Sequence, residues 1–107
     1  MIKMSVLYAG KPGSRFDVDY YVNVHMPMAA RLLGAAVKEI SVEIGIGGAA
    51  PGLPAPYAAI AGFTCDSVEA FTAAFVPIAD QLQGDIPNYT DIVPVIQISE
   101  LREIGPA

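Results

Sequence analysis

Tyr21 and His25 lie four residues apart in a largely apolar stretch, and His25 is the only histidine of the chain. Imidazole is the side chain whose ordinary pKa lies closest to neutrality, so it can accept and return a proton under physiological conditions. On a helix, a tyrosine four positions earlier lies on the same face. This spacing predicts His25 as a catalytic general acid/base, with Tyr21 placed to orient a substrate or to share the proton.

A structural interpretation of His25 stays open beside the catalytic one. Histidines on apolar helical faces often serve packing, with their ring nitrogens bonded to a carbonyl or a carboxylate. Pro27 follows two residues later and removes the amide that would bond the carbonyl of Asn23, so we expect a kink or restart of the helix just after His25. In this interpretation, His25 stabilises the kink and does no chemistry.

A second polar group precedes the last predicted strand and comprises Asp85, Asn88, Tyr89 and Asp91. If it reaches the helix that carries His25, Asp85 or Asp91 would make the imidazole more basic, and Asn88 or Tyr89 would donate to a substrate oxygen. Aspartate and asparagine also accept local backbone hydrogen bonds in turns. We interpret Asp85 and Asp91 as turn residues and keep Asn88 and Tyr89 as candidate substrate-binding residues.

The elements that would position these residues alternate between strands and helices. Alternating apolar and polar residues predict half-buried strands, and apolar residues at helical spacing predict amphipathic helices. We expect strands over residues 2–8, 40–46, 57–65 and 92–99, and helices over residues 17–34 and 68–82.

Local signals define the ends of the two predicted helices. Asp17 is a suitable N-cap for the first helix, and Gly34 ends it. Asp66 with Glu69 three residues later is typical of a capping box for the second helix. Pro77 should disturb that helix midway, because proline lacks the amide hydrogen.

The order strand, helix, strand, strand, helix, strand predicts a ferredoxin-like α+β fold, formed by residues 1–107 as a single domain. In this fold, two helices cover one face of a four-stranded antiparallel sheet. The last strand has apolar residues on both faces, although the helices can cover only one. A second copy of the chain would cover the other face, so we expect a homodimer.

Composition excludes several classes of protein. The net charge is −5 and the six Lys and Arg residues are scattered, which argues against binding to nucleic acid. No apolar run approaches the roughly 18 residues of a membrane span, and the N-terminal residues do not resemble a signal peptide, so we expect a cytoplasmic protein. The single cysteine, Cys65, excludes an internal disulfide and a Cys/His metal cluster, and we expect neither a metal nor a cofactor.

Four separated segments together resemble the EthD family of the dimeric α+β barrel superfamily. Matching several motifs in the right order is far more specific than matching one. The segments are Leu7-Tyr8 with Lys11-Pro12-Gly13, Phe16-Asp17 through Tyr20-Tyr21 to His25-Met26-Pro27, Asp66-Ser67-Val68-Glu69-Ala70-Phe71, and Asp85-Ile86-Pro87-Asn88-Tyr89-Thr90-Asp91 leading into Pro94-Val95-Ile96-Gln97-Ile98-Ser99.

The resemblance implies that two subunits pack their sheets face to face into a barrel, each with a cleft between its own sheet and helices. The family takes its name from a gene required alongside a cytochrome-containing ether-degrading system, and it is loosely linked to oxidoreductases. Relatives in the superfamily include lactone isomerases, which carry a histidine at a similar place, cofactor-free monooxygenases and haem-dependent peroxidases. Some family members look like dehydratases or decarboxylases of polyketides.

Because one fold hosts several reactions, the resemblance leaves three hypotheses for the function, of which haem-assisted oxidation with His25 as an iron ligand ranks last. The first is a cofactor-independent enzyme that acts by acid/base chemistry on a small apolar oxygenated compound, of aromatic, lactone or polyketide-like type, in a catabolic or biosynthetic pathway. The second is a non-catalytic accessory or ligand-binding protein that supports a partner oxidoreductase in ether or aromatic degradation.

Overall fold

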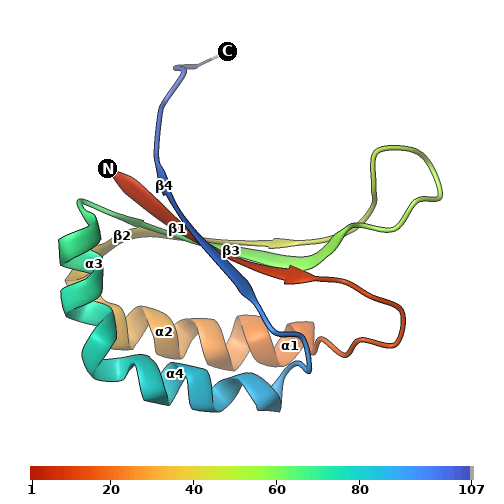
Figure 1. Cartoon of the computed structure of the whole chain (residues 1–107), viewed down its shortest axis with the longest axis horizontal. Helices are drawn as coiled ribbons and strands as arrows, with labels where there is room; N and C mark the ends of the chain where they lie inside the picture. The colour runs from red at the N-terminus through yellow and green to blue at the C-terminus, as the bar shows by residue number, and fades with distance from the viewer. Residues whose placement is uncertain (107) are drawn as a thin grey trace.

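Four antiparallel strands form one sheet in the order β2-β3-β1-β4 (Figure 1). The structure is a computed structural model and describes residues 1–106. The strands are β1 (Ile2–Ala9), β2 (Val37–Ile44), β3 (Tyr57–Cys65) and β4 (Val95–Glu100).

Two helical stretches cover one face of this sheet, and each is named here as one helical layer (Figure 1). The first layer consists of α1 (Val18–Tyr20), η1 (Tyr21–His25), α2 (Met26–Leu33) and η2 (Gly34–Ala36). The second consists of α3 (Val68–Phe75), η3 (Val76–Ile78), α4 (Ala79–Asp85) and η4 (Ile86–Asn88). The element order confirms the predicted ferredoxin-like α+β fold.

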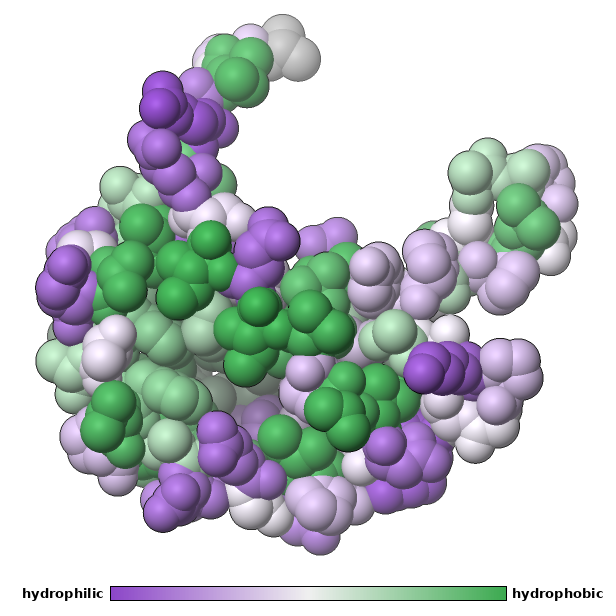
Figure 2. Space-filling view, viewed as in Figure 1, coloured by the Kyte–Doolittle hydropathy of each residue, from purple (hydrophilic) through white to green (hydrophobic). Residues whose placement is uncertain are grey.

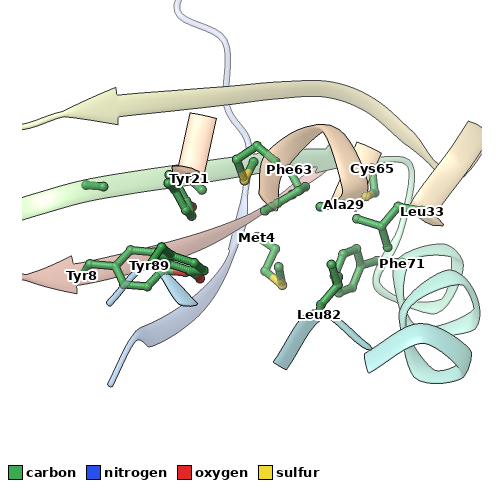
Figure 3. Packing of buried hydrophobic residues seen from close by; sticks show 13 residues of the cluster. Met4, Tyr8, Tyr21, Ala29, Leu33, Phe63, Cys65, Phe71, Leu82 and Tyr89 are labelled. Carbon is green, nitrogen blue, oxygen red and sulfur yellow. The ribbon is translucent and has the colours of Figure 1, made fainter. Parts of the chain in front are cut away.

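The core lies between the sheet and the helices. Met4 and Tyr8 of β1 face the helices, and Phe63 of β3 is the register partner of Met4. Alanines on β3 bring the helices close to the sheet, because their side chains occupy little space. Figure 3 shows how side chains from β1, β3 and both helical layers meet; the labelled set is Met4, Tyr8, Tyr21, Ala29, Leu33, Phe63, Cys65, Phe71, Leu82 and Tyr89.

The helix ends agree with the prediction in the first layer and differ in the second. The carboxylate of Asp17 accepts from the backbone amide of Tyr20 at 3.1 Å, and Gly34 ends α2 with a φ of 62°. The predicted capping box at Asp66 is wrong by one residue. Ser67 is the N-cap of α3, and its hydroxyl accepts from the amide of Ala70 at 3.0 Å.

The boundaries of two strands, β2 and β4, differ from the predicted ones by more than one residue. β2 begins at Val37, opposite Cys65 of β3, and ends at Ile44 rather than at residue 46. β4 begins at Val95, three residues later than predicted, because Pro94 has no amide hydrogen to give to the ladder. Pro94 was a local signal for the later start of β4, whereas no single residue marks the start of β2 at Val37.

The first helical layer contains a wide π-helical turn at Tyr21–His25, where the amide of Met26 donates to the carbonyl of Tyr21. We predicted a kink or restart of the helix just after His25, and the regular α-helix α2 does begin at Met26, directly after the wide turn. A proline ring clashes with the carbonyl four residues earlier in a regular α-helix. A wider turn immediately before Pro27 removes that clash while the helix continues.

Strand β4 lies at the edge of the sheet and is apolar on both faces, as predicted. Ile96 is the register partner of Val6, on the face toward the helices, whereas Val95 is the partner of Leu7, on the opposite face. The exposed fractions of Val95 and Ile96 are 60% and 56%. The apolar surface in the view of Figure 2 includes this edge, where the helices do not cover the sheet.

The molecule also presents two extended segments on the side of the sheet away from the helices, the 45–56 loop and the 101–106 stretch (Figure 1). The loop is rich in glycine and proline, as the sequence predicted. Within residues 1–106, none of the helices has the length and apolar character needed to cross a membrane.

Candidate functional site

A cavity of about 80 Å³ lies between the sheet and the two helical layers, around the predicted catalytic histidine. Most of its wall is apolar. Its polar contributors are His25, Tyr8, Tyr21 and Gln83. The apolar side chains come from β1, β3, β4 and both helical layers, and they include Met4, Val6, Met26, Leu33, Phe63, Phe71, Phe75, Leu82, Ile86 and Ile96.

His25 is buried in η1 and is held by a carboxylate from the second helical layer. Its Nδ1 lies 2.9 Å from Oδ2 of Asp85, the last residue of α4. Since a carboxylate only accepts hydrogen bonds, Nδ1 of His25 donates and carries a proton. In the neutral ring, Nε2 then has the free lone pair.

The Nε2 atom of His25 has no protein partner within residues 1–106. His25 lines the cavity, and the hydrogen bonds in this part of the chain involve only Nδ1 of its ring. Every fully buried side-chain nitrogen and oxygen among the described residues has a partner. Nε2 is therefore not fully buried, and in the neutral ring it is the acceptor that His25 can offer to an occupant of the cavity.

Asp85 is itself held by three side-chain donors. Besides His25, the hydroxyl of Tyr20 donates to Oδ1 at 2.7 Å and the amide of Asn88 donates to Oδ1 at 2.9 Å. Burial opposes the charged carboxylate, but the hydrogen bonds from His25, Tyr20 and Asn88 outweigh it and hold the pKa of Asp85 below its usual value. Asp85 is thus a fixed negative charge beside the imidazole.

Two tyrosines, Tyr21 and Tyr89, lie against the ring of His25, and a third, Tyr8, packs against both of them. The rings of Tyr21 and His25 are stacked with their centroids 5.6 Å apart, and the ring of Tyr89 lies 4.7 Å from that of His25. The hydroxyls of Tyr8 and Tyr89 are 2.7 Å apart, and Figure 3 shows these two side chains side by side. Burial raises the pKa of Tyr8, Tyr21 and Tyr89, so all three phenols keep their protons.

The structure brings most of the predicted site residues together. Tyr21 and Tyr89 lie against His25, whereas Asn88 is exposed, does not line the cavity and contacts Asp85. Our interpretation of Asp85 as a turn residue is wrong, because all the hydrogen-bond partners of its carboxylate are side chains. The carboxylate of Asp91 accepts from the backbone amide of Arg15 at 2.9 Å, which anchors the segment before α1.

Sequence analysis overlooked two tyrosines of the site, Tyr8 and Tyr20. A signal for Tyr8 was available, since alternation along β1 places it on the same face as Met4 and Val6. No spacing connects Tyr20 with Asp85, because the two residues are 65 positions apart and meet only when the helical layers pack. Cys65 is buried at the end of β3, away from the cavity wall.

The arrangement suits proton transfer better than metal binding. Among the described residues, no three His, Cys, Asp or Glu side chains lie close enough together to hold a metal ion. His25 and Asp85 already use their facing atoms on each other. The pair instead orients one imidazole nitrogen toward an apolar space.

Comparison with known proteins supports this fold, and the matched region contains the residues of this site. The model of the EthD domain matches residues 14–92, which contain His25, Asp85 and Tyr89. The chain belongs to the EthD family. It is 47% identical to an EthD-like protein from Ralstonia eutropha JMP134, whose crystal structure superposes with a TM-score of 0.89 over 92% of this chain and 89% of that one. No curated protein matches the chain.

More distant solved structures show the fold alone. An ethyl tert-butyl ether degradation (EthD) family protein from Bacillus halodurans C-125 is 18% identical, with a TM-score of 0.73 over 95% of this chain and 99% of that one. A dimeric ferredoxin-like protein of unknown function from Thermobifida fusca YX is 16% identical, with a TM-score of 0.59 over 94% and 90% of the two chains.

Proposed function

We propose that this EthD-family protein is a cofactor-independent enzyme in which His25 moves a proton on a small, mostly apolar oxygenated compound. The observation that carries the proposal is how the ring of His25 is held: Nδ1 is fixed on Asp85, and the ring lines a mostly apolar cavity. A base at an apolar cavity, held in one tautomer by a carboxylate, is suited to general acid/base catalysis.

The chemistry requires only His25, Asp85 and a positioned substrate. Nε2 takes a proton from an acidic C–H or O–H group, and the imidazolium that forms keeps its hydrogen bond to the Asp85 carboxylate. The same proton then returns to another atom of the substrate or to a leaving group. Tyr21, stacked on the imidazole, is placed to hold the substrate oxygen. Isomerisation, dehydration and decarboxylation all fit this sequence of steps.

The volume of the cavity restricts the substrate. An engineered cavity of about 150 Å³ holds benzene, and this cavity has about 80 Å³. A ring compound would therefore displace wall residues, and the unbranched side chains of Met4 and Met26 can adapt most easily. We propose substrates with a single small ring, such as phenols, lactones or compact polyketide-like compounds.

Proton exchange in heavy water tests this function without knowledge of the product. Small lactones and enolisable ketones would be incubated with the protein in D₂O, and loss of the substrate C–H signal would be followed by NMR. We expect exchange that falls about 100-fold or more in His25→Gln. Asp80→Asn, an exposed change at the start of α4, is the matched control and should keep the full rate.

An unchanged exchange rate in the His25→Gln variant would contradict the role given to His25. Complete absence of exchange with every compound, together with tight binding that His25→Gln retains, would favour the second candidate. That candidate is a ligand-binding accessory protein supporting a partner oxidoreductase in ether or aromatic degradation. The mostly apolar wall of the cavity favours it, because such a wall binds hydrophobic compounds without any chemistry.

We further propose that two copies associate through their sheets. The exposed apolar residues of the edge strand β4 support this, and the Thermobifida fusca relative is described as dimeric. Light scattering at micromolar concentration should give the mass of two chains. A monomer under these conditions would contradict the proposed dimer.

A further inference from the structure

Tyr8 occupies the centre of the tyrosine group and faces the cavity. It lies in β1, is 2% exposed and contributes to the cavity wall, whereas Tyr89 is fully buried and does not. The ring of Tyr21 meets that of Tyr8 edge-on, with centroids 5.5 Å apart. Tyr8 thus borders the cavity, and its hydroxyl lies 2.7 Å from that of Tyr89, which does not border it.

The number of protons on the two hydroxyls decides which one donates. Tyr8 and Tyr89 carry one phenolic proton each, and the bond between their oxygens uses one of them. If Tyr8 donated, the proton of Tyr89 would be left inside the fully buried region without an acceptor, which is costly. If Tyr89 donates, the proton of Tyr8 remains available at the cavity. The second arrangement is the favourable one.

The position of Tyr8 distinguishes it from its partner Tyr89. Burial raises the pKa of both phenols, so each hydroxyl keeps its proton and can donate a hydrogen bond. Tyr8 borders the cavity and Tyr89 does not, so Tyr8 is the member of the pair that can donate to a ligand.

We propose that the Tyr8 hydroxyl donates a hydrogen bond to a ligand oxygen that carries or develops negative charge, so that the site selects phenols, enols and enolisable carbonyl compounds. Ethers and hydrocarbons of the same size give this donor a weaker acceptor or none. The proposal names the substrate class of the site described above and rests on the proposed function. It adds to the base, His25, a donor that stabilises the charge that the base creates.

The charges around the cavity limit this selection to weak acids. The wall contains no Lys or Arg side chain among the described residues, and the carboxylate of Asp85 lies behind the imidazole. A permanently charged carboxylate would enter this space without a cation to pair with, which is unfavourable. An oxygen that shares its charge with a ring or an enol is better matched to a single phenolic donor.

Binding of a series of small phenols tests the proposal. Phenol, 4-fluorophenol and 4-cyanophenol differ in acidity at similar size, and anisole has the same ring with a methylated oxygen. We expect the affinity of the unmodified protein to rise with the acidity of the phenol and to be about tenfold or more weaker for anisole. In Tyr8→Phe, the phenols should lose about tenfold or more and the dependence on acidity should vanish.

Two further variants make the result specific. Tyr57→Phe removes a tyrosine outside the cavity wall and should keep both the affinities and their dependence on acidity. Tyr89→Phe removes the donor to Tyr8 without touching the cavity, and it should weaken the dependence on acidity. Thermal unfolding of each variant verifies that the fold is retained.

Equal affinities in Tyr8→Phe and the unmodified protein would overturn the proposal, and so would failure of all three phenols to bind at millimolar concentration. Failure of the proposed catalytic function can be distinguished from failure of this binding proposal. If phenols bind with the expected dependence on acidity while no compound exchanges its protons, the Tyr8 site stands and catalysis by His25 does not.

Discussion

Each helical layer contains one irregular turn beside a proline between its two α-helical segments, and these two turns differ in what they present. The π-helical turn at Tyr21–His25 precedes Pro27 and buries a phenol and an imidazole against the sheet. The tighter turn at Val76–Ile78 contains Pro77 and has no ionisable side chain, and Val76 is 65% exposed. The same covalent cause therefore produces a candidate active-site element in one layer and a bend in the other.

The difference indicates that an irregular turn becomes a candidate active site only when the other helical layer supplies a polar partner, as Asp85 does for His25. The first turn lies beside the last residue of α4, so that Asp85 reaches His25. Wide turns of this kind occur often at functional sites, because they change the direction of side chains without ending the helix. Substitutions at the two turns should therefore have unequal effects.

The largest contrast is expected in stability. Tyr21→Ala would remove a fully buried aromatic side chain from the core and should lower the free energy of unfolding by about 3–5 kcal/mol. Val76→Ala, at the exposed turn, should change it by no more than about 0.5 kcal/mol. Chemical denaturation of both variants measures the difference. Similar losses of unfolding free energy in the two variants would contradict the prediction, because the first turn would then contribute no more to core packing than the exposed one.

A smaller contrast is expected in the response to acid. The pKa of Asp85 is lowered in the folded state, so its charged form stabilises the protein above the ordinary aspartate pKa of about 3.9, and this stabilisation disappears as the pH falls through the lower folded-state value. Asp85→Asn lacks this contribution, and its stability should change less between neutral and acidic pH. Asp80→Asn in the same helix is the control, and identical acid profiles for the two variants would refute the assignment.

The smallest contrast concerns the prolines themselves. Pro27→Ala restores an amide hydrogen and removes the ring that favours the wide turn, so η1 can tighten and shift the ring of His25. Pro77→Ala leaves that turn alone. The imidazole signals of the single histidine in NMR spectra should move in Pro27→Ala and stay in place in Pro77→Ala. Movement in both variants would indicate that the two layers are coupled.

The sequence predicted the fold because its signals are local. Alternating residues defined four strands, Asp17 and Gly34 marked the ends of the first helix, and Pro77 marked the bend of the second. The errors fall where local signals compete, as at Asp66 and Ser67, two neighbouring residues that can each cap a helix. The ends of β2 depend on pairing with β3, which the residues of β2 do not encode alone, whereas the start of β4 was marked by Pro94 within an apolar run.

The site was predictable only in part, for a physical reason. His25 and Tyr21 are neighbours on one helical segment, so their spacing indicated the contact. The carboxylate that holds His25 lies 60 residues away, and the turn-forming residues around Asp85 suggested a local role instead. The His25–Asp85 contact forms only when η1 and α4 pack together, and the residue pattern along either element does not predict it.

The most direct test of the central claim is the protonation pattern of the His25 ring, measured by NMR through the couplings of its two nitrogens to the ring protons. The chain has one histidine, so the assignment is unambiguous. We predict that in the neutral ring Nδ1 carries the proton and Nε2 is free, and that Asp85→Asn yields a mixture of the two tautomers. A proton on Nε2 in the unmodified protein would contradict the account, because the cavity would then meet a donor where the proposed chemistry needs a base.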